Sequence, residues 1–309
     1  MLRWEPVEVG DPGPGQVRLR QHAAGLNFID VYHRTGLYPQ PLPFTPGVEG
    51  AGVVESVGEG VEHVKAGDRV AYAGPIGGYA EVRLIDADRL VKLPDDFGFD
   101  LAAAMMLQGM TARMLLRSVY PVAAGDMILV HAAAGGVGLI LCQWAAALGA
   151  VVIGTVSTDD KAELARAHGC QHPIVYTRQD FVAEVERITS GAKLPVVYDS
   201  VGRDTFLRSL DCLRPRGLMV SFGQSSGAIE PFSPSLLQQK GSLFLTRPTL
   251  FHYIASRAEL EASAAELFEV VGSGAVRIEV KQRFPLEQAA DAHRALEARA
   301  TSGSTVLTV

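Results

Sequence analysis

The chain has 309 residues, 48% of them hydrophobic and 20% charged, and its formal net charge is −6. This length suits two domains better than one, and the composition is ordinary for a soluble globular protein. Because the balance is acidic and no Lys/Arg-rich run is present, nucleic acid is not expected as the main partner.

Cysteine usage indicates a reducing compartment. The three cysteines, Cys142, Cys170 and Cys212, are odd in number and widely spaced. This argues against a disulfide framework or a zinc cluster, so we expect a cytoplasmic protein. Cys142 falls in an apolar helical segment and is expected to be plain core. The N-terminal segment has no apolar run that would predict a signal peptide, and no run of about 18 apolar residues predicts a membrane span.

Short strands separated by glycine and proline turns dominate the chain up to about residue 100. A Gly-Asp turn precedes one of these strands, and Gly77-Gly78 precedes another. This texture predicts a barrel-like, β-rich domain. The strand patterns lie at 17–23, 50–57, 65–72 and 77–82.

The most specific signal is the segment 127–150, MILVHAAAGGVGLILCQWAAALGA. Its start predicts a buried strand, followed by a glycine-rich turn and an apolar helix. The turn fits G-x-G-x-x-G with Ala133 in the first position. Gly135 would let the backbone approach a pyrophosphate, and Gly138 would let the helix pack closely on its strand. The phosphate would lie at the helix N-terminus. The alternative is a tight turn that binds nothing.

After this turn, the pattern of apolar residues alternates between that of strands and that of helices. Such βαβ units with short links predict an α/β fold with a parallel, doubly wound Rossmann-type sheet. The predicted strands are 151–155, 174–176, 195–199, 217–223 and 243–246, and the predicted helices are 161–168, 180–189 and 204–213.

The C-terminal tail is expected to pack back on the β-rich domain and so to make that domain discontinuous. Its pattern predicts helices at 257–271 and 286–299 and strands at 276–280 and 305–309.

Several segments together resemble the medium-chain dehydrogenase/reductase superfamily, and within it the zinc-free, zeta-crystallin-like NADPH:quinone oxidoreductases. The resemblance covers nearly the whole chain. It is carried by GLNFIDVY (25–32), GLYP (36–39), PGVEGAG (46–52), KAGDRV (65–70), HAAAGGVGLILCQWAAALGA (131–150), YDSVG (198–202), GLMVSFG (217–223) and TRP (246–248).

The resemblance implies a GroES-like substrate domain at 1–108 and 247–309, and a Rossmann NADP-binding domain at 109–246. We expect the active cleft to lie between them. The segment 243–246 should lie at the edge of the sheet and could pair with its symmetry mate, which would give a homodimer. Family members usually begin with a further strand ahead of Arg3, so either the start is truncated or that strand is absent.

Zinc-dependent members of the superfamily place a cysteine ligand where Asn27 stands and a histidine where Val48 stands. Valine cannot ligate and a neutral amide is a poor replacement, so no metal is expected. Glu49 and Asp30 look like remnants of the zinc surroundings, reused for packing and hydrogen bonding. Without a Lewis acid, the hydride acceptor should be a quinone or a conjugated enone, which delocalises the negative charge.

By resemblance, Asn27 and Tyr32 line the nicotinamide side of the cleft, and Tyr32 orients the acceptor or supplies a proton. Thr111 is placed at the start of the helix behind the nicotinamide. Gln108 stands where the family often has a lysine, so any charge role there is lost.

Structural alternatives exist for several of these residues. Tyr32 could instead close an aromatic cluster with Phe28 and Tyr38, and Asn27 could brace a turn. His131, just before the glycine turn, is expected to be a satisfied strand-end residue rather than a catalyst.

Cofactor preference depends on the end of the second nucleotide-domain strand. NAD-specific folds place an acidic residue there, whereas this chain has the apolar Val156. Lys161 can pair with a 2′-phosphate, Ser157 can donate to it, and Tyr176 ends the next strand. We therefore expect NADPH. By resemblance, the cofactor site also includes Ala134, Gly135, Gly136, Val137, Gly138, Ser200, Phe222, Gly223, Ser225, Arg247 and Arg299.

The acidic pair Asp159 and Asp160 complicates this preference. Their carboxylates could point outward as favourable charges at a helix N-terminus, or they could weaken phosphate binding.

The expected function is a metal-independent, NADPH-dependent quinone reductase. The alternatives are an enoyl or enone reductase with the same machinery, and a non-catalytic nucleotide-binding protein of the crystallin kind. Intact Asn27, Tyr32, Lys161 and Arg247 favour an enzyme.

Overall fold

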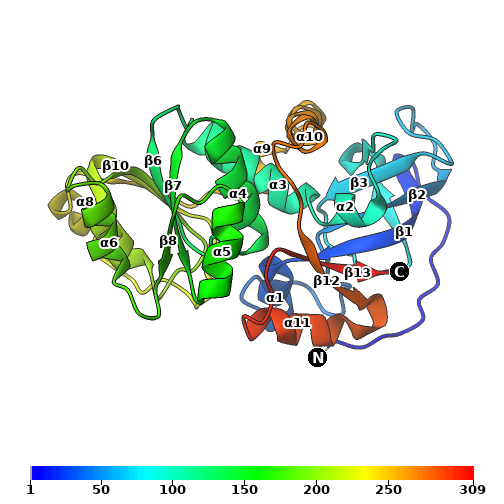
Figure 1. Cartoon of the computed structure of the whole chain (residues 1–309). Coiled ribbons are helices and arrows are strands. Elements are labelled where there is room, and N and C mark those ends of the chain that lie inside the picture. Colours follow the sequence, from blue (N-terminus) through cyan, green and yellow to red (C-terminus); the bar gives the residue numbers. More distant parts are fainter. Residues whose placement is uncertain (1) are drawn as a thin grey trace. The chain divides into compact units, whose positions relative to one another are not determined.

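The structure is a computed structural model that describes residues 2–309, and it divides into two compact units (Figure 1). The first unit contains the chain up to Met110 together with Tyr253–Glu269 and Ile278–Val309. The second unit contains Thr111–His252 and Val270–Arg277.

A six-stranded sheet forms the centre of the second unit, and every pair of neighbouring strands in it is parallel. The strand order is β11-β10-β9-β6-β7-β8. From β6 the chain adds β7 and β8 on one side and then β9, β10 and β11 on the other, which confirms the doubly wound sheet. Its strands are β6 (Met127–Val130), β7 (Val151–Val156), β8 (His172–Val175), β9 (Leu194–Asp199), β10 (Leu213–Ser221) and β11 (Phe244–Thr246).

Helices cover both faces of this sheet, with α4 and α5 on one face and α6 and α8 on the other (Figure 1). Buried aliphatic and aromatic side chains such as Leu129, Phe181 and Phe206 fill the α6 side. Full burial of such a side chain stabilises the fold by about 1.5–3 kcal/mol. The helices are the π-helix η2 (Met114–Val119), α4 (Gly136–Ala147), α5 (Asp159–Ala167), α6 (Phe181–Ile188), α7 (Phe206–Ser209), the 3-10 turn η3 (Leu210–Cys212), α8 (Ser235–Gln239) and α9 (Leu250–Tyr253).

The first unit is built on a mixed seven-stranded sheet of order β12-β13-β1-β2-β3-β5, with β4 paired to β1. The C-terminal strand β13 lies antiparallel to β1, so segments from both ends of the sequence share one sheet. Its strands are β1 (Gln16–Leu26), β2 (Glu49–Val57), β3 (Arg69–Ala73), β4 (Val82–Asp86), β5 (Val91–Lys92), β12 (Val280–Pro285) and β13 (Ser304–Thr308).

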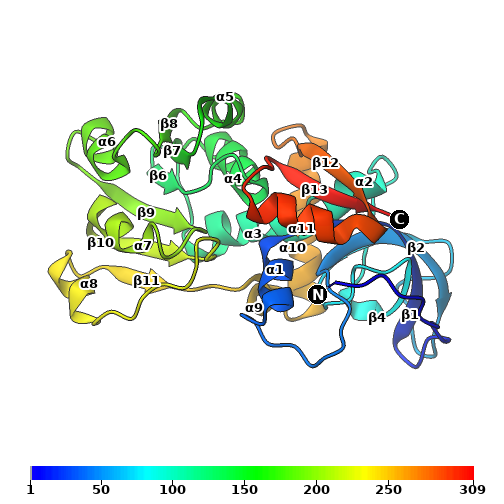
Figure 2. The ribbon, with the colours of Figure 1, turned by 90° about the horizontal axis from the view of Figure 1, so that it is seen from below.

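Helices α1 and α11 lie side by side in this unit (Figures 1 and 2), and Arg34 Nη2 donates to Glu297 Oε1 between them at 2.7 Å. Helix α3 continues across the division between the units at Met110. The helices are α1 (Phe28–Thr35), η1 (Ala87–Arg89), α2 (Phe99–Ala103), α3 (Met106–Arg113), α10 (Arg257–Gly272), η4 (Leu286–Gln288) and α11 (Ala289–Glu297). Within residues 2–309, no helix combines the length and the apolar character that crossing a membrane requires.

Several sequence predictions need correction. The strand expected at 276–280 is wrong, because the strand runs over Val280–Pro285. The backbone just before this strand makes hydrogen bonds outside the sheet. Val276 N–H donates to the Val270 carbonyl. The Gln143 amide donates to the Arg277 carbonyl and accepts from the Arg277 N–H. The helix expected at 204–213 is short, because Leu213 already belongs to β10.

Helices α1, α2 and α3 interrupt a region that the sequence predicts as β-rich. They are five to eight residues long. Segments this short show too few turns for a helical period to stand out from a run of apolar residues.

Candidate functional site

The glycine turn joins β6 to α4 as the sequence predicts. Ala133 N–H donates to the Thr155 carbonyl at 3.0 Å, which ties the turn to the neighbouring strand β7. Gly135 is the N-cap of α4, and its N–H donates to the Ala132 carbonyl at 2.9 Å. The first N–H groups of α4, starting at Gly136, have no acceptor within the helix and are available to an anion.

Two glycines of this turn have different steric roles. A Cβ at Gly138 would overlap the Ala132 carbonyl oxygen and lie 2.9 Å from Ala133 Cα, so only glycine lets the helix approach the turn. A Cβ at Gly135 would meet only the Ala132 oxygen, at 3.3 Å, because the space beside Gly135 is open. An open, side-chain-free backbone at a helix N-terminus fits a pyrophosphate.

Parallel strands place all their carboxyl ends at one edge of the sheet, and the structure brings most of the predicted cofactor residues to that edge. The exception is Arg299, which follows α11 in the first unit. The residues at the edge are Ala134, Gly135, Gly136, Val137 and Gly138 after β6, Ser157 and Lys161 after β7, Tyr176 after β8, Ser200 after β9, Phe222, Gly223 and Ser225 after β10, and Arg247 after β11.

The turns after β9 and β10 are locked together by backbone contacts. Phe222 N–H donates to the Asp199 carbonyl at 2.8 Å, and Ser225 N–H donates to the Ser200 carbonyl at 3.1 Å. A Cβ at Gly223 would lie 2.7 Å from the Ser200 oxygen, so the two turns pack too closely for a side chain there.

Two side chains, Asp199 and Arg247, form hydrogen bonds to the backbone at these strand ends. The buried Asp199 carboxylate accepts from Val201 N–H at 2.7 Å and Gly202 N–H at 3.0 Å. Arg247 Nη1 donates to the Ser221 carbonyl at 3.1 Å and to its hydroxyl at 3.0 Å. The sequence motif contains Asp199, but its capping role was not predicted, because it depends on how the chain turns after β9.

The segment Gly223–Gly227 matches G-x-S-x-G, the sequence of a nucleophile elbow. That motif requires a helix directly after the serine, whereas the chain here runs through turns until α8 begins at Ser235. The match therefore carries no hydrolytic chemistry.

The ends of β7 and β8 form the corner where a 2′-phosphate is expected. Val156 is buried, and Tyr176 N–H donates to its carbonyl at 3.0 Å. Asp159, one of the two acidic residues that complicate the NADPH prediction, forms a two-pronged ion pair with Arg178, whose Nη1 lies 2.6 Å from Asp159 Oδ2. The hydrogen bond from Arg178 lowers the pKa of Asp159. Sequence reasoning missed Arg178, because no short-range pattern links it to Asp159.

His131 is a satisfied strand-end residue, as predicted. Its Nδ1 lies 2.9 Å from Thr155 Oγ1 and its Nε2 lies 2.8 Å from Ser209 Oγ. Burial lowers its pKa, so the ring is neutral and both of its nitrogens are engaged.

In the first unit, Asn27 caps α1 and is held by side chains from distant segments. Its Nδ2 donates to Glu49 Oε1 at 2.6 Å, and its Oδ1 accepts from Gln108 Nε2 at 3.0 Å. Glu49 Oε2 accepts from Leu107 N–H at 2.7 Å, and Asp30 Oδ2 accepts from Asn27 N–H at 2.9 Å. Glu49 and Asp30 therefore act as buried hydrogen-bonding groups, as predicted.

Burial dominates the electrostatics of this cluster. It raises the pKa of Glu49 to about 8 and that of Asp30 to about 7, because both carboxyl groups are removed from water. Within residues 2–309, no three His, Cys, Asp or Glu side chains gather in an arrangement that would hold a metal ion.

Tyr32 is 8% exposed and packs in an aromatic cluster with Tyr38, at a centroid distance of 5.2 Å, and Phe28, at 6.1 Å. This is the structural alternative that the sequence left open, and the direct role of Tyr32 stays a prediction. The predicted position of Thr111 needs correction: it lies inside α3, which begins at Met106, and not at the start of a helix.

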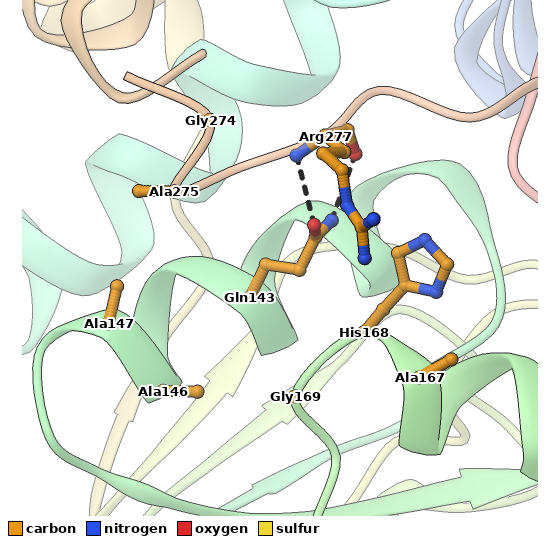
Figure 3. A pocket seen from close by; sticks show the side chains of 9 residues that line it. All are labelled: Gln143, Ala146, Ala147, Ala167, His168, Gly169, Gly274, Ala275 and Arg277. Atoms are coloured by element: carbon orange, nitrogen blue, oxygen red, sulfur yellow. Dashed lines mark hydrogen bonds between the residues drawn. The ribbon is translucent and has the colours of Figure 1, made fainter.

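A pocket of about 410 Å³ lies elsewhere in the second unit (Figure 3). It lies along the C-terminal half of α4, near the end of α5, whereas the glycine turn is at the N-terminus of α4. Figure 3 shows the Gln143 amide bonded to the backbone of Arg277, whose guanidinium points toward His168. None of the predicted site residues lines this pocket.

Comparison with known proteins identifies relatives over the whole chain. Residues 13–95 match the alcohol dehydrogenase GroES-like domain, and residues 136–269 match the zinc-binding dehydrogenase family. A quinone oxidoreductase of Pseudomonas aeruginosa is 53% identical over 99% of this chain and 95% of its own length. A 2-haloacrylate reductase of Burkholderia is 49% identical over 98% of this chain and 94% of its own. The crystal structure of Escherichia coli quinone oxidoreductase complexed with NADPH superimposes with a TM-score of 0.96 at 49% identity, covering 100% of this chain and 95% of that one.

Proposed function

The chain belongs to the quinone oxidoreductase family of the medium-chain dehydrogenases/reductases, and we propose that it transfers a hydride from NADPH to a quinone without a bound metal. The observation that carries this proposal is the glycine turn, whose backbone fits a pyrophosphate, in a chain similar throughout to quinone oxidoreductases.

The second unit would hold the cofactor. The N–H groups at the start of α4 suit the pyrophosphate, and Ser157, Lys161 and Tyr176 suit the 2′-phosphate. Arg178 supports the NADPH preference indirectly, because its ion pair offsets the negative charge of Asp159. Bound NADPH would supply the hydride from its nicotinamide ring.

Asn27 and Tyr32 of the first unit would be the groups that orient the acceptor, and Thr111 of α3 stays a further candidate residue. Asn27 is suited to this role because its amide is held by side chains on both sides. Groups held in place before the reaction lower the barrier without reorganising during it.

We propose that the enzyme works without zinc, although one matching family is named for zinc binding. The Val48 side chain has no ligating atom, and the Asn27 amide oxygen, the atom that could ligate, accepts a hydrogen bond from Gln108. Elemental analysis of the purified protein should show no stoichiometric zinc. About one tightly held zinc ion per chain, with activity lost to a chelator, would contradict the proposal.

A conjugated enone or enal is the second candidate acceptor. The similarity to a 2-haloacrylate reductase favours it, because a haloacrylate is also a conjugated acceptor. Both acceptors take a hydride without a Lewis acid, so the same residues serve either reaction.

The test is NADPH oxidation, followed by the absorbance of the reduced nicotinamide, against quinones, enals, enoyl thioesters and simple alkyl ketones. We expect fast turnover with quinones and little with alkyl ketones. Rapid reduction of alkyl ketones with inert quinones and enals would overturn the mechanism. Tight NADPH binding without turnover of any acceptor would indicate a non-catalytic nucleotide-binding protein.

We also propose a cytoplasmic homodimer. Strand β11 ends the six-stranded sheet and carries Phe244 and Leu245, which are 61% and 39% exposed. An exposed apolar edge strand suits pairing with its own copy about a two-fold axis. Light scattering should give the mass of a dimer, and a monomer would remove this part of the proposal. The three free cysteines are compatible with a reducing compartment.

A further inference from the structure

A continuous chain of buried hydrogen bonds crosses the first unit and ends at the Asn27 amide. Ser304 Oγ donates to Gln108 Oε1 at 2.7 Å, and Gln108 Nε2 donates to Asn27 Oδ1 at 3.0 Å. Asn27 Nδ2 then donates to Glu49 Oε1 at 2.6 Å. None of these four residues is more than 7% exposed, so each of these polar groups depends on its protein partner.

The acceptor oxygens of Glu49 set the direction of this chain of bonds, and the Ser304 hydroxyl completes it at the other end. Both Glu49 oxygens accept in the structure, Oε1 from Asn27 and Oε2 from the Leu107 N–H, so the Asn27 amide faces Glu49 with its nitrogen and Gln108 with its oxygen. Gln108 must then present its nitrogen to Asn27 and its oxygen to the Ser304 hydroxyl. Turning the Asn27 amide around by itself would set its nitrogen against the Gln108 nitrogen, and this buried hydrogen bond would be lost.

This arrangement determines what Asn27 can offer to a third group. An amide nitrogen carries two hydrogens, and the bond to Glu49 uses one of them. The second hydrogen of Nδ2 is then a donor whose direction is set by Gln108 and Glu49. A donor stabilises an oxygen on which negative charge develops, whereas an amide oxygen in that place would repel it.

We propose that Gln108 and Ser304 are positioning residues, which orient the Asn27 carboxamide so that its nitrogen donates to the acceptor's carbonyl oxygen. This inference rests on the proposed function, which places Asn27 beside the acceptor. Gln108 acts directly on Asn27, and Ser304 acts through Gln108.

The kinetic test compares three variants of the full-length enzyme. Gln108→Met removes the donor to Asn27 and should lower kcat about tenfold, since one lost hydrogen bond changes a rate by this order. Ser304→Ala removes only the far end of the chain and should lower kcat about threefold. Gln108→Lys keeps a donor toward Asn27 and should retain more activity than Gln108→Met. The KM for NADPH should change little in all three.

The matched control is Thr305→Val on the same strand. Thr305 Oγ1 donates to Gln282 Oε1 at 3.1 Å, outside the chain of bonds that reaches Asn27. This variant removes a hydroxyl next to Ser304 and should leave kcat unchanged. If Thr305→Val and Ser304→Ala have the same effect on kcat, or if Gln108→Met is folded and fully active, the inference is overturned.

A second readout does not depend on turnover. In amide-proton NMR spectra of the wild-type protein, the Asn27 side-chain NH₂ should give two separate, exchange-protected signals. In Ser304→Ala and Gln108→Met these signals should move and exchange faster, while in Thr305→Val they should not. Unchanged Asn27 signals in Gln108→Met would overturn the inference even if the protein proves inactive with every acceptor. Wild-type inactivity would instead count against the proposed function.

Discussion

Most candidate cofactor residues of the second unit lie on or just after the turns that follow its strands, whereas Asn27 in the first unit is held, directly or through Gln108, by side chains from three other segments. The glycine turn, Ser157 and Ser200 owe their places to backbone geometry that repeats from strand to strand. The bonds of Asn27 join it to Glu49, Gln108 and, through Gln108, to Ser304, which is 277 positions away along the chain (304 − 27). The site of the second unit should therefore tolerate most side-chain substitutions but few at its glycines. The hydrogen-bond network around Asn27 should instead be disrupted by the loss of any one of its polar side chains.

Substitution of Gly138 should have the largest effect on the backbone site. In Gly138→Val the new side chain would overlap the Ala132 carbonyl, so we expect a loss of about 3 kcal/mol in the free energy of unfolding, together with loss of NADPH binding. Thermal unfolding and fluorescence titration with NADPH would measure both.

Gly135→Ala is the control for this prediction. Its Cβ has room beside the Ala132 oxygen, so stability should change by less than about 1 kcal/mol while NADPH binding weakens. Equal stability losses in the two variants would show that the turn is not organised by the close packing at Gly138.

The pH dependence of stability should reveal the side-chain network of the first unit. Burial raises the pKa of Glu49 from its ordinary value of 4.5 to about 8. The folded state therefore keeps a proton that the unfolded state loses. Stability from this group is complete below pH 4.5 and is lost as the pH rises through about 8.

Glu49→Gln should flatten this decline, by about 1.4 kcal/mol for each unit by which the pKa is raised. Thermal melts of both proteins between pH 5 and pH 8 would measure it. The buried Asp30, whose pKa is raised to about 7, should leave a residual slope in the variant. Parallel pH profiles for the two proteins would show that Glu49 is ionised in the folded state throughout.

Lys161→Ala should have a smaller effect, and it should separate the two nicotinamide cofactors. Loss of a charge-assisted contact to the 2′-phosphate costs about 1–3 kcal/mol, so NADPH should bind at least about tenfold more weakly. NADH, which lacks this phosphate, should bind as before. Titration with both cofactors measures the ratio, and equal losses would mean that Lys161 only supports the fold.

Arg178→Ala should have the smallest effect. Without its ion pair, Asp159 would present an unbalanced negative charge near the 2′-phosphate, so NADPH should bind about threefold more weakly. The double variant Asp159→Asn/Arg178→Ala should recover the wild-type affinity, because the charge is gone. A double variant as weak as Arg178→Ala would show that Arg178 itself contacts the cofactor.

Most of the candidate cofactor residues were implied by the resemblance to the family. The sequence by itself predicted the parallel sheet and the glycine turn. These features depend on short-range patterns: an apolar run makes a strand, glycines permit a turn, and parallel strands must all end at one edge. The same reasoning failed for the strand at 276–280, where the Gln143 side chain, far away in the sequence, takes the backbone hydrogen bonds of Arg277.

Only the tertiary structure decided how the polar residues of the first unit are used. The sequence singled out Asn27, Glu49 and Gln108 separately, but it did not show that they are bonded to one another or that Ser304 completes the chain. The Arg178 partner of Asp159 was hidden in the same way. A hydrogen bond between two side chains requires their atoms to lie within about 3 Å of each other. Which residues meet at that distance is set by the packing of whole strands and helices, and residue type and spacing do not encode it.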